Sequence, residues 1–203
     1  MITGSRAAAR SLLPVLLFAT AACAHFAAAA EPSEWGVEEL MRRLAGIKSS
    51  TARFTERKHL AILNAPLESS GTLVYTAPGR LEKHTLAPRR ESLVLERDQL
   101  TLEDKERKQR RTVSLPDYPV IWAFVEGIRS TLAGDLPTLN RYYQVGLDGG
   151  ERQWRLTLKP SDPKMLEFVS EIRIGGSRDG INSIEIVESG GDRSVMAITK
   201  DGP

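Results

Sequence analysis

Residues 154–159 read Trp-Arg-Leu-Thr-Leu-Lys, and this stretch decides the fold class. Apolar side chains at Trp154, Leu156 and Leu158 alternate with polar ones, which is the period of a strand with one buried face. The same kind of pattern, divided by turn signals, predicts strands near 51–60, 69–77, 80–87, 91–97, 99–105, 109–115, 140–148, 152–159, 166–176, 181–189 and 193–200. Because no βαβ unit is evident, these strands predict an antiparallel sheet that curls toward a barrel.

Two helices are expected beside the strands. Ser33 is a suitable N-cap for a helix running through Ser49, which buries one stripe of apolar residues. Asp117 as N-cap and Pro119 in the first turn predict a second helix, which continues to Leu132. A short polar stretch is expected to follow it, before the strands resume. The fold class is therefore α+β, mainly β with helices.

The first thirty residues have the composition of a secretory signal. Arg6 and Arg10 precede a short apolar run, and residues 28–30 are alanines before Glu31. The apolar run falls short of the roughly 20 residues needed to span a bilayer. We expect a signal peptide at 1–30, a single domain at 31–203, and export to the periplasm. An alternative is lipoprotein processing at Cys23, which follows Thr20-Ala21-Ala22.

Removal of this segment changes the charge and cysteine balance. Arg6 and Arg10 are two of the 28 basic residues, so 26 basic residues then face 26 acidic ones. A neutral chain has no overall attraction for nucleic acid or for an anionic membrane. Cys23 is the single cysteine and leaves with the signal, which excludes disulfides and thiol chemistry in the mature part.

Motifs for catalysis and metal binding are missing from the sequence. His59 and His84 lie on different predicted strands and belong to no metal-binding motif. Residues 175–180 resemble a hairpin loop more than the nucleophile elbow of a serine hydrolase. Glu82 and Glu96 are expected to face solvent, and the mixed charges of 103–111 predict a solvated hairpin tip. We therefore expect no cofactor, no metal and no enzymatic activity.

Apolar residues on the predicted sheet and on the second helix form a candidate binding site. If the helix covers the sheet as a lid over an incompletely filled cavity, acyl chains are suitable ligands, because each buried CH₂ contributes about 0.8 kcal/mol. A densely packed core of helix on sheet explains the same residues equally well. The candidates are Leu73, Tyr75, Leu93, Leu95, Leu102, Val113, Trp154, Leu156 and Leu158 on strands, and Ile121, Trp122, Phe124, Val125 and Ile128 on the helix.

Short motifs resemble the LolA family of periplasmic lipoprotein carriers, especially its divergent LolA-related branch. Phe54-Thr55-Glu56 resembles the family's Phe-x-Gln. Residues 71–75, Gly-Thr-Leu-Val-Tyr, and 78–81, Pro-Gly-Arg-Leu, resemble its Gly-x-Leu and Arg-Pro-Gly regions. The order and spacing of these motifs extend the resemblance over about 34–200.

The resemblance implies an incompletely closed antiparallel barrel of about eleven strands with a helical lid. It also implies a monomeric carrier, a chaperone in outer-membrane biogenesis. Such a carrier takes lipoproteins, or another acylated lipid, from an inner-membrane ABC-type transporter and passes them to an outer-membrane acceptor. Three positions depart from the family pattern, and one is the hairpin turn at Arg97-Asp98, which lacks the family's Gly. Ala77 stands where carriers have an arginine that ties the lid to the barrel, and Lys83 stands where they usually have an aromatic residue.

Two further hypotheses use the same fold. In the first, the domain is a sensor or interaction module that regulates an envelope partner. In the second, it is an outer-membrane acceptor anchored through Cys23.

The start of the mature protein separates the carrier from the anchored acceptor. We expect N-terminal sequencing or intact-mass measurement of exported protein to give Glu31 as the first residue. A lipidated Cys23 at the N-terminus would instead establish the acceptor.

Overall fold

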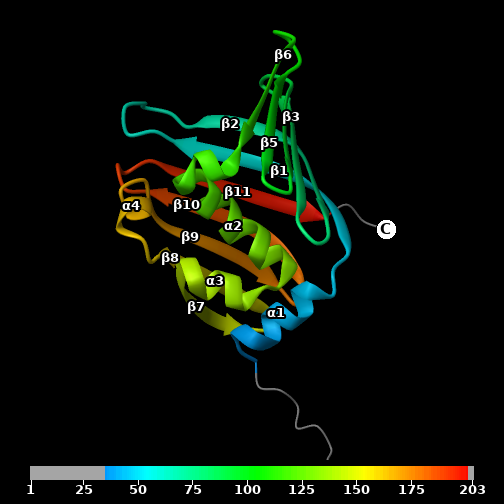
Figure 1. Cartoon of the computed structure of the whole chain (residues 1–203), viewed down its shortest axis with the longest axis vertical. Coiled ribbons are helices and arrows are strands. Elements are labelled where there is room, and N and C mark those ends of the chain that lie inside the picture. The colour runs from blue at the N-terminus through cyan, green and yellow to red at the C-terminus, as the bar shows by residue number, and fades with distance from the viewer. Residues whose placement is uncertain (1–34, 201–203) are drawn as a thin grey trace, which may run out of the picture. The chain divides into compact units, whose positions relative to one another are not determined.

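Eleven antiparallel strands make up one curved sheet in the computed structural model, which describes residues 35–200 (Figure 1). The predicted signal segment, Cys23 and Ser33 lie outside the described residues. The prediction of eleven strands is confirmed. The strands are β1 (Ser49–His59), β2 (Leu67–Thr76), β3 (Arg80–Ala87), β4 (Glu91–Glu96), β5 (Gln99–Asp104), β6 (Gln109–Ser114), β7 (Tyr143–Gly150), β8 (Gln153–Pro160), β9 (Val169–Ser177), β10 (Gly180–Glu188) and β11 (Arg193–Lys200).

The sheet consists of two runs of consecutive hairpins joined at their ends. Its strand order is β6-β5-β4-β3-β2-β1-β11-β10-β9-β8-β7, so the first strand pairs with the last. In that pairing Phe54 lies opposite Ile198, and Glu56 lies opposite Met196. β6 and β7 are the two edge strands, and the sheet order leaves them unpaired with each other. The barrel is therefore incompletely closed, as the family resemblance implies.

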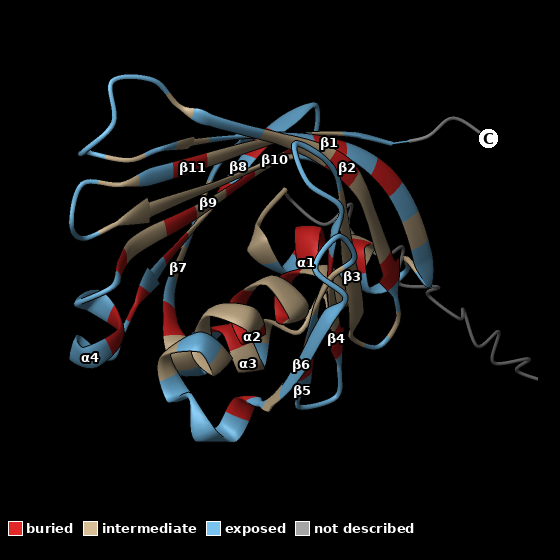
Figure 2. Cartoon of the chain, turned by 90° about the horizontal axis from the view of Figure 1, so that it is seen from above, coloured by how far each residue is buried: buried red, intermediate tan, exposed pale blue. Residues whose placement is uncertain are grey.

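The segment between the two edge strands is helical and lies inside the curve of the sheet (Figure 2). It contains a single 3₁₀ turn, η1 (Leu115–Asp117), followed by α2 (Pro119–Ala133) and α3 (Leu136–Tyr142). Because this segment must connect one edge with the other, it crosses the open side of the barrel. None of the described helices is both long and apolar enough to cross a membrane.

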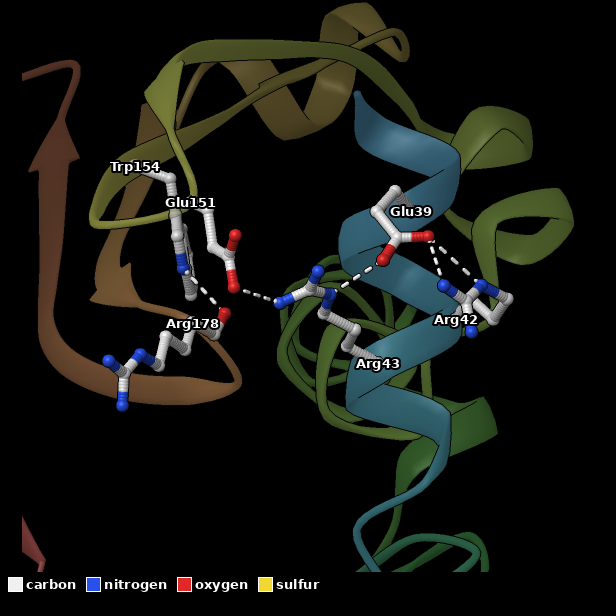
Figure 3. A network of polar contacts seen from close by, with 6 residues as sticks. All are labelled: Glu39, Arg42, Arg43, Glu151, Trp154 and Arg178. Atoms are coloured by element: carbon white, nitrogen blue, oxygen red, sulfur yellow. Dashed lines mark hydrogen bonds and ion pairs between the residues drawn. The ribbon is translucent and has the colours of Figure 1, made fainter. Parts of the chain in front are cut away.

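A polar network fixes helix α1 (Val37–Ala45) beside the β7–β8 turn (Figure 3). Glu39, only 5% exposed, accepts hydrogen bonds from Arg42 and Arg43, and Arg43 also reaches Glu151 at 2.6 Å. Trp154 Nε1 donates to the Arg178 carbonyl at 3.0 Å. Burying Glu39 without these cations would leave an uncompensated charge in the protein, so the network sets the position of α1.

The predicted boundaries of the first helix are wrong at its C-terminal end. The helix ends at Ala45, where the Gly46 amide donates to the Arg43 carbonyl and the Ile47 amide donates to the Leu44 carbonyl, and Ser49 already begins β1. Its described N-terminus has Gly36 in the N-cap position, with no side-chain cap. The apolar spacing that suggested a longer helix continues into Ile47 because this residue still packs against the same core.

The start of α2 also differs from the prediction. Pro119 occupies the first turn as expected, but Asp117 belongs to the preceding 3₁₀ turn, and Tyr118 takes the N-cap position. The helix ends at Gly134, whose φ of 68° is left-handed. A Cβ there would come within 2.1 Å of the Met41 carbonyl oxygen, so glycine permits the close approach of α2 to α1.

Two short helices are formed by residues that the sequence assigns to loop or strand. α3 covers the expected polar stretch, and the Asp135 carboxylate caps it by accepting from the Thr138 amide at 3.0 Å. α4 (Pro163–Leu166) is capped in the same way by Asp162 and delays the start of β9 to Val169. Both are too short to show a helical period, although an Asp followed by a proline marks each N-terminus.

Arg129 connects helix α2 to two turns of the sheet. Its Nη1 donates to the Arg97 carbonyl in the β4–β5 turn at 2.9 Å, and its Nη2 pairs with Glu126. Its aliphatic part covers Gly79 in the β2–β3 turn, where a Cβ would lie 2.6 Å from Arg129 Cδ. Helix α2 thus supplies an arginine to the β2–β3 turn, where Ala77 stands in place of the arginine of the family pattern.

Replacement of Arg129 with alanine should loosen the attachment of α2. Hydrogen bonds to charged groups contribute roughly 1.5–3 kcal/mol, so we expect amide exchange in α2 to accelerate about tenfold or more. Hydrogen–deuterium exchange checks this, with Arg57→Ala as control, because the Arg57–Glu68 pair is exposed and far from α2. Equal exchange rates in α2 of both variants would show that Arg129 does not hold the helix.

Candidate functional site

A partly open cavity of about 470 Å³ lies between the sheet and helix α2. Its wall is almost entirely apolar, and its volume falls in the range of roughly 300–1,000 Å³ typical of small-molecule sites. The sheet lines it from β1 to β5 and again from β10 and β11, while α2 and the end of α1 supply the rest. Among the lining residues are Leu44, Ile47, Ala52, Leu73, Tyr75, Leu81, Leu93, Leu95, Leu100, Ile121, Phe124, Val125, Ile128, Leu132, Ile181, Ile184, Ile186, Met196 and Ile198.

Strand register explains why these side chains meet on the inner face. Leu73 pairs with Lys83, Lys83 with Leu93, and each of these residues lines the cavity. Successive side chains on a strand point to opposite faces, so residues two apart share the inner one. On β1 the same alternation brings Ala52 and Glu56 to the cavity wall.

The structure brings together many of the residues that the sequence singles out. Four come from the sheet and four from the lid helix, and all line one cavity: Leu73, Tyr75, Leu93, Leu95, Ile121, Phe124, Val125 and Ile128. The helical period on α2 and the strand period on β2 and β4 are sufficient to select them. The space beneath α2 is thus partly unfilled, which the alternative of a dense core did not anticipate.

The remaining candidate residues lie elsewhere. Trp154, Leu156 and Leu158 are fully buried in a packed cluster with α1, α3 and β9, because their half of the sheet is covered by helices. Trp122 and Val113 pack against a smaller cluster around Leu115. Trp122 also meets Tyr142 edge-to-face, with ring centroids 5.0 Å apart.

Leu102 borders a second, more polar cavity of about 320 Å³ on β3 to β5. Glu91, Glu103 and Asp104 are among its lining residues. Lys83 and Leu93 line both cavities, so the apolar and polar spaces adjoin at Lys83.

Sequence reasoning missed the C-terminal wall of the cavity. Ile184, Ile186, Met196 and Ile198 lie on β10 and β11. Their alternation is visible in the sequence and predicts inward-facing side chains. Their contribution to this cavity depends on the pairing of β11 with β1, a contact between the two ends of the chain that alternation cannot reveal.

An ion pair interrupts the apolar wall on the inner face of the sheet. Lys83 Nζ donates to Glu56 Oε2 at 2.5 Å, and both residues line the cavity. The carboxylate also accepts from Ser194 Oγ at 2.6 Å and from Ser69 Oγ at 3.2 Å. The Lys83 ammonium lies 5.0 Å from the centroid of the Phe54 ring. Four strands therefore converge on this one carboxylate.

The pKa of Glu56 lies below its ordinary value. Burial raises this pKa, but the hydrogen bonds from Lys83, Ser194 and Ser69 lower it by more. Glu56 is consequently ionised at neutral pH, and the pair presents one positive and one negative charge to the cavity.

Glu96 is exposed as expected, and Glu82 is 20% exposed because ion-pair partners cover its carboxylate. Glu82 accepts from Arg80 Nε at 2.9 Å and lies 2.9 Å from His84 Nε2. Alternation along β3 explains why Glu82 lies on the face opposite to Lys83. The described residues 35–200 contain no cluster of His, Cys, Asp or Glu suited to a metal ion.

A comparison with individual curated proteins gives no match. The chain is similar in structure to a LolA superfamily protein from Nitrosomonas europaea (10% identity, TM-score 0.43, covering 82% of this chain and 94% of that one). It is also similar to the Pseudomonas aeruginosa MucA/MucB complex (14%, 0.43, 80% and 55%) and to LprF from Mycobacterium bovis (8%, 0.36, 84% and 96%).

The sequence model of one family matches residues 28–199, which is most of the chain. This match confirms the resemblance seen in the short motifs at 54–56, 71–75 and 78–81. The chain therefore belongs to the family described as outer membrane lipoprotein carrier protein LolA-like.

Proposed function

We propose that this protein is a periplasmic carrier that binds the acyl chains of lipoproteins, or of a related lipid, in the cavity beneath α2. The observation that carries the proposal is the partly unfilled apolar cavity in a LolA-like chain. An acyl chain gains about 0.8 kcal/mol for each CH₂ that it buries, and it needs no reactive group from the protein. Binding without chemistry suits a carrier, which must release its cargo unchanged.

The direction of transport follows from family membership and remains part of this proposal. An exported carrier would receive its cargo from an inner-membrane ABC-type transporter and deliver it to an outer-membrane acceptor. Helix α2 is the movable wall in this scheme, because it is attached to the sheet through Arg129 and through packing rather than through strand pairing. The signal peptide at 1–30 and a monomeric state complete the proposal.

Mass spectrometry of protein purified gently from its native periplasm tests the function directly. We expect bound lipid or lipoprotein with the wild-type chain. Phe124→Asp should lose most of it, because the charge is forced into an apolar cavity. Phe168→Asp is the matched control, since Phe168 is 56% exposed.

Repeated absence of acylated cargo from the wild-type protein would contradict the carrier role. Cargo retained equally by both Asp variants would show that the cavity beneath α2 is not where the cargo binds. Trp122 is a less suitable probe than Phe124, because it packs in the cluster around Leu115 and its substitution disturbs the fold.

A further inference from the structure

We infer that Lys83, held by Glu56, is the site that hydrogen-bonds the carbonyl oxygen of an acyl ester or amide, and that the chain extends from there into the apolar cavity. This inference rests on the proposed function and adds the chemical class of head group that the cavity accepts.

The Glu56–Lys83 pair lies on the inner face, whereas a comparable cross-strand pair of β1 and β2 lies outside. Arg57, next to Glu56 on β1, pairs with Glu68 on β2 at 2.9 Å, and the two side chains are exposed by 65% and 59%. The side chains of Glu56 and Lys83 are exposed by only 16% and 29%. An ion pair that is removed from water contributes little net stability compared with apolar side chains. Stability of the sheet therefore gives no reason for this pair to occupy the cavity wall.

The hydrogen-bonding capacity that remains belongs to Lys83. Glu56 already accepts from three donors, so its oxygens are largely satisfied. The Lys83 ammonium has three N–H bonds, and the described structure directs one of them to Glu56. A ligand that meets this pair is therefore offered donors, and it must supply an acceptor oxygen.

The charge of the pair selects the kind of acceptor. With Glu56 ionised, the two charges cancel over a short distance. A neutral carbonyl can accept from the ammonium without adding charge to a weakly hydrated space. A free fatty-acid carboxylate would bring a second negative charge beside Glu56, and this repulsion is strong where water is scarce. The pair thus favours acyl esters and amides over free fatty acids.

The position of Lys83 suits the start of an acyl chain. The polar cavity on β3 to β5 begins at Lys83, and the apolar wall extends from the same residue toward Ile128 and Leu132 on α2. The diagonal from Lys83 to Glu56 crosses β2 at Gly71, which has no side chain to separate them. If the carbonyl binds at Lys83, the acyl chain lies in the apolar cavity and the rest of the head group points toward the polar cavity.

A binding series with one chain and three head groups tests the inference. The probes are dodecanoic acid, its glycerol monoester and its N-methyl amide, measured at neutral pH by displacement of a fluorescent acyl probe. We expect the wild type to bind the ester and the amide about tenfold more tightly than the acid, because the carboxylate of the acid adds a negative charge beside Glu56.

Variants of the two residues should change this order in opposite ways. Glu56→Gln leaves the ammonium unbalanced, so the acid should become the preferred ligand. Lys83→Met removes the donor and leaves Glu56 without its cation, so ester and amide binding should weaken about tenfold and acid binding should weaken by more. Glu68→Gln, in the exposed ion pair of Glu68 on β2 with Arg57 on β1, is the matched control and should behave as the wild type.

The outcomes separate this inference from the proposed function. If the folded wild type binds none of the probes, the proposed function and the inference both fail. If it binds all three equally, and neither variant changes their order, the inference alone is overturned. Circular dichroism and thermal melting verify folding. Lys83→Arg keeps the charge and the donors and should preserve the preference, so it decides the matter if Lys83→Met does not fold.

Discussion

The pairing of β1 with β11 is the constraint on which the rest of the structure depends. It joins two runs of hairpins, each of which has a free edge, into one sheet with its first and last strands at the centre. The two free edges, β6 and β7, then lie at opposite ends of the sheet. Because they are consecutive in the chain, the segment between them has to cross the open side, and its helices become the cover. Without this pairing, Ile198 and Met196 would not lie beside Ala52 and Glu56 in the wall of one cavity.

The cover divides the inner face into a packed half and an unfilled half. Over β8 and β9, helices α1 and α3 fill the space, and residues such as Leu156 and Ile172 are completely buried. Over β1 to β5, α2 is held by Arg129 and by a small cluster around Leu115, and the cavity remains. The chain therefore gains its stability in one half and keeps apolar surface available in the other. A rigid half supporting an unfilled half is suited to binding a flexible ligand.

The sequence predicts the strands, the hairpin turns and the α2 side of the cavity, because each depends on local period. Leu73 and Tyr75, or Phe124 and Ile128, are recognised from spacing alone. It could not distinguish Leu95, which faces the cavity, from Leu156, which has the same pattern but is covered by helices. Nor could it predict the Glu56–Lys83 pair, since these residues are separated by 27 positions and by an intervening strand. The family pattern marked Lys83 as unusual, and its partner became evident only from the register.

A carrier must hold its ligand firmly enough to cross the periplasm and loosely enough to release it. Apolar burial is nearly independent of position along an acyl chain, so an entirely apolar cavity would let the chain slide and would accept any lipid tail. In the inferred binding mode, a single polar contact at Lys83 would fix one point of the ligand, and the partnership with Glu56 would limit the strength of that contact. An unpaired ammonium would bind anions tightly and compete with release. The neutral pair would thus combine selection of the head group with easy release of the chain.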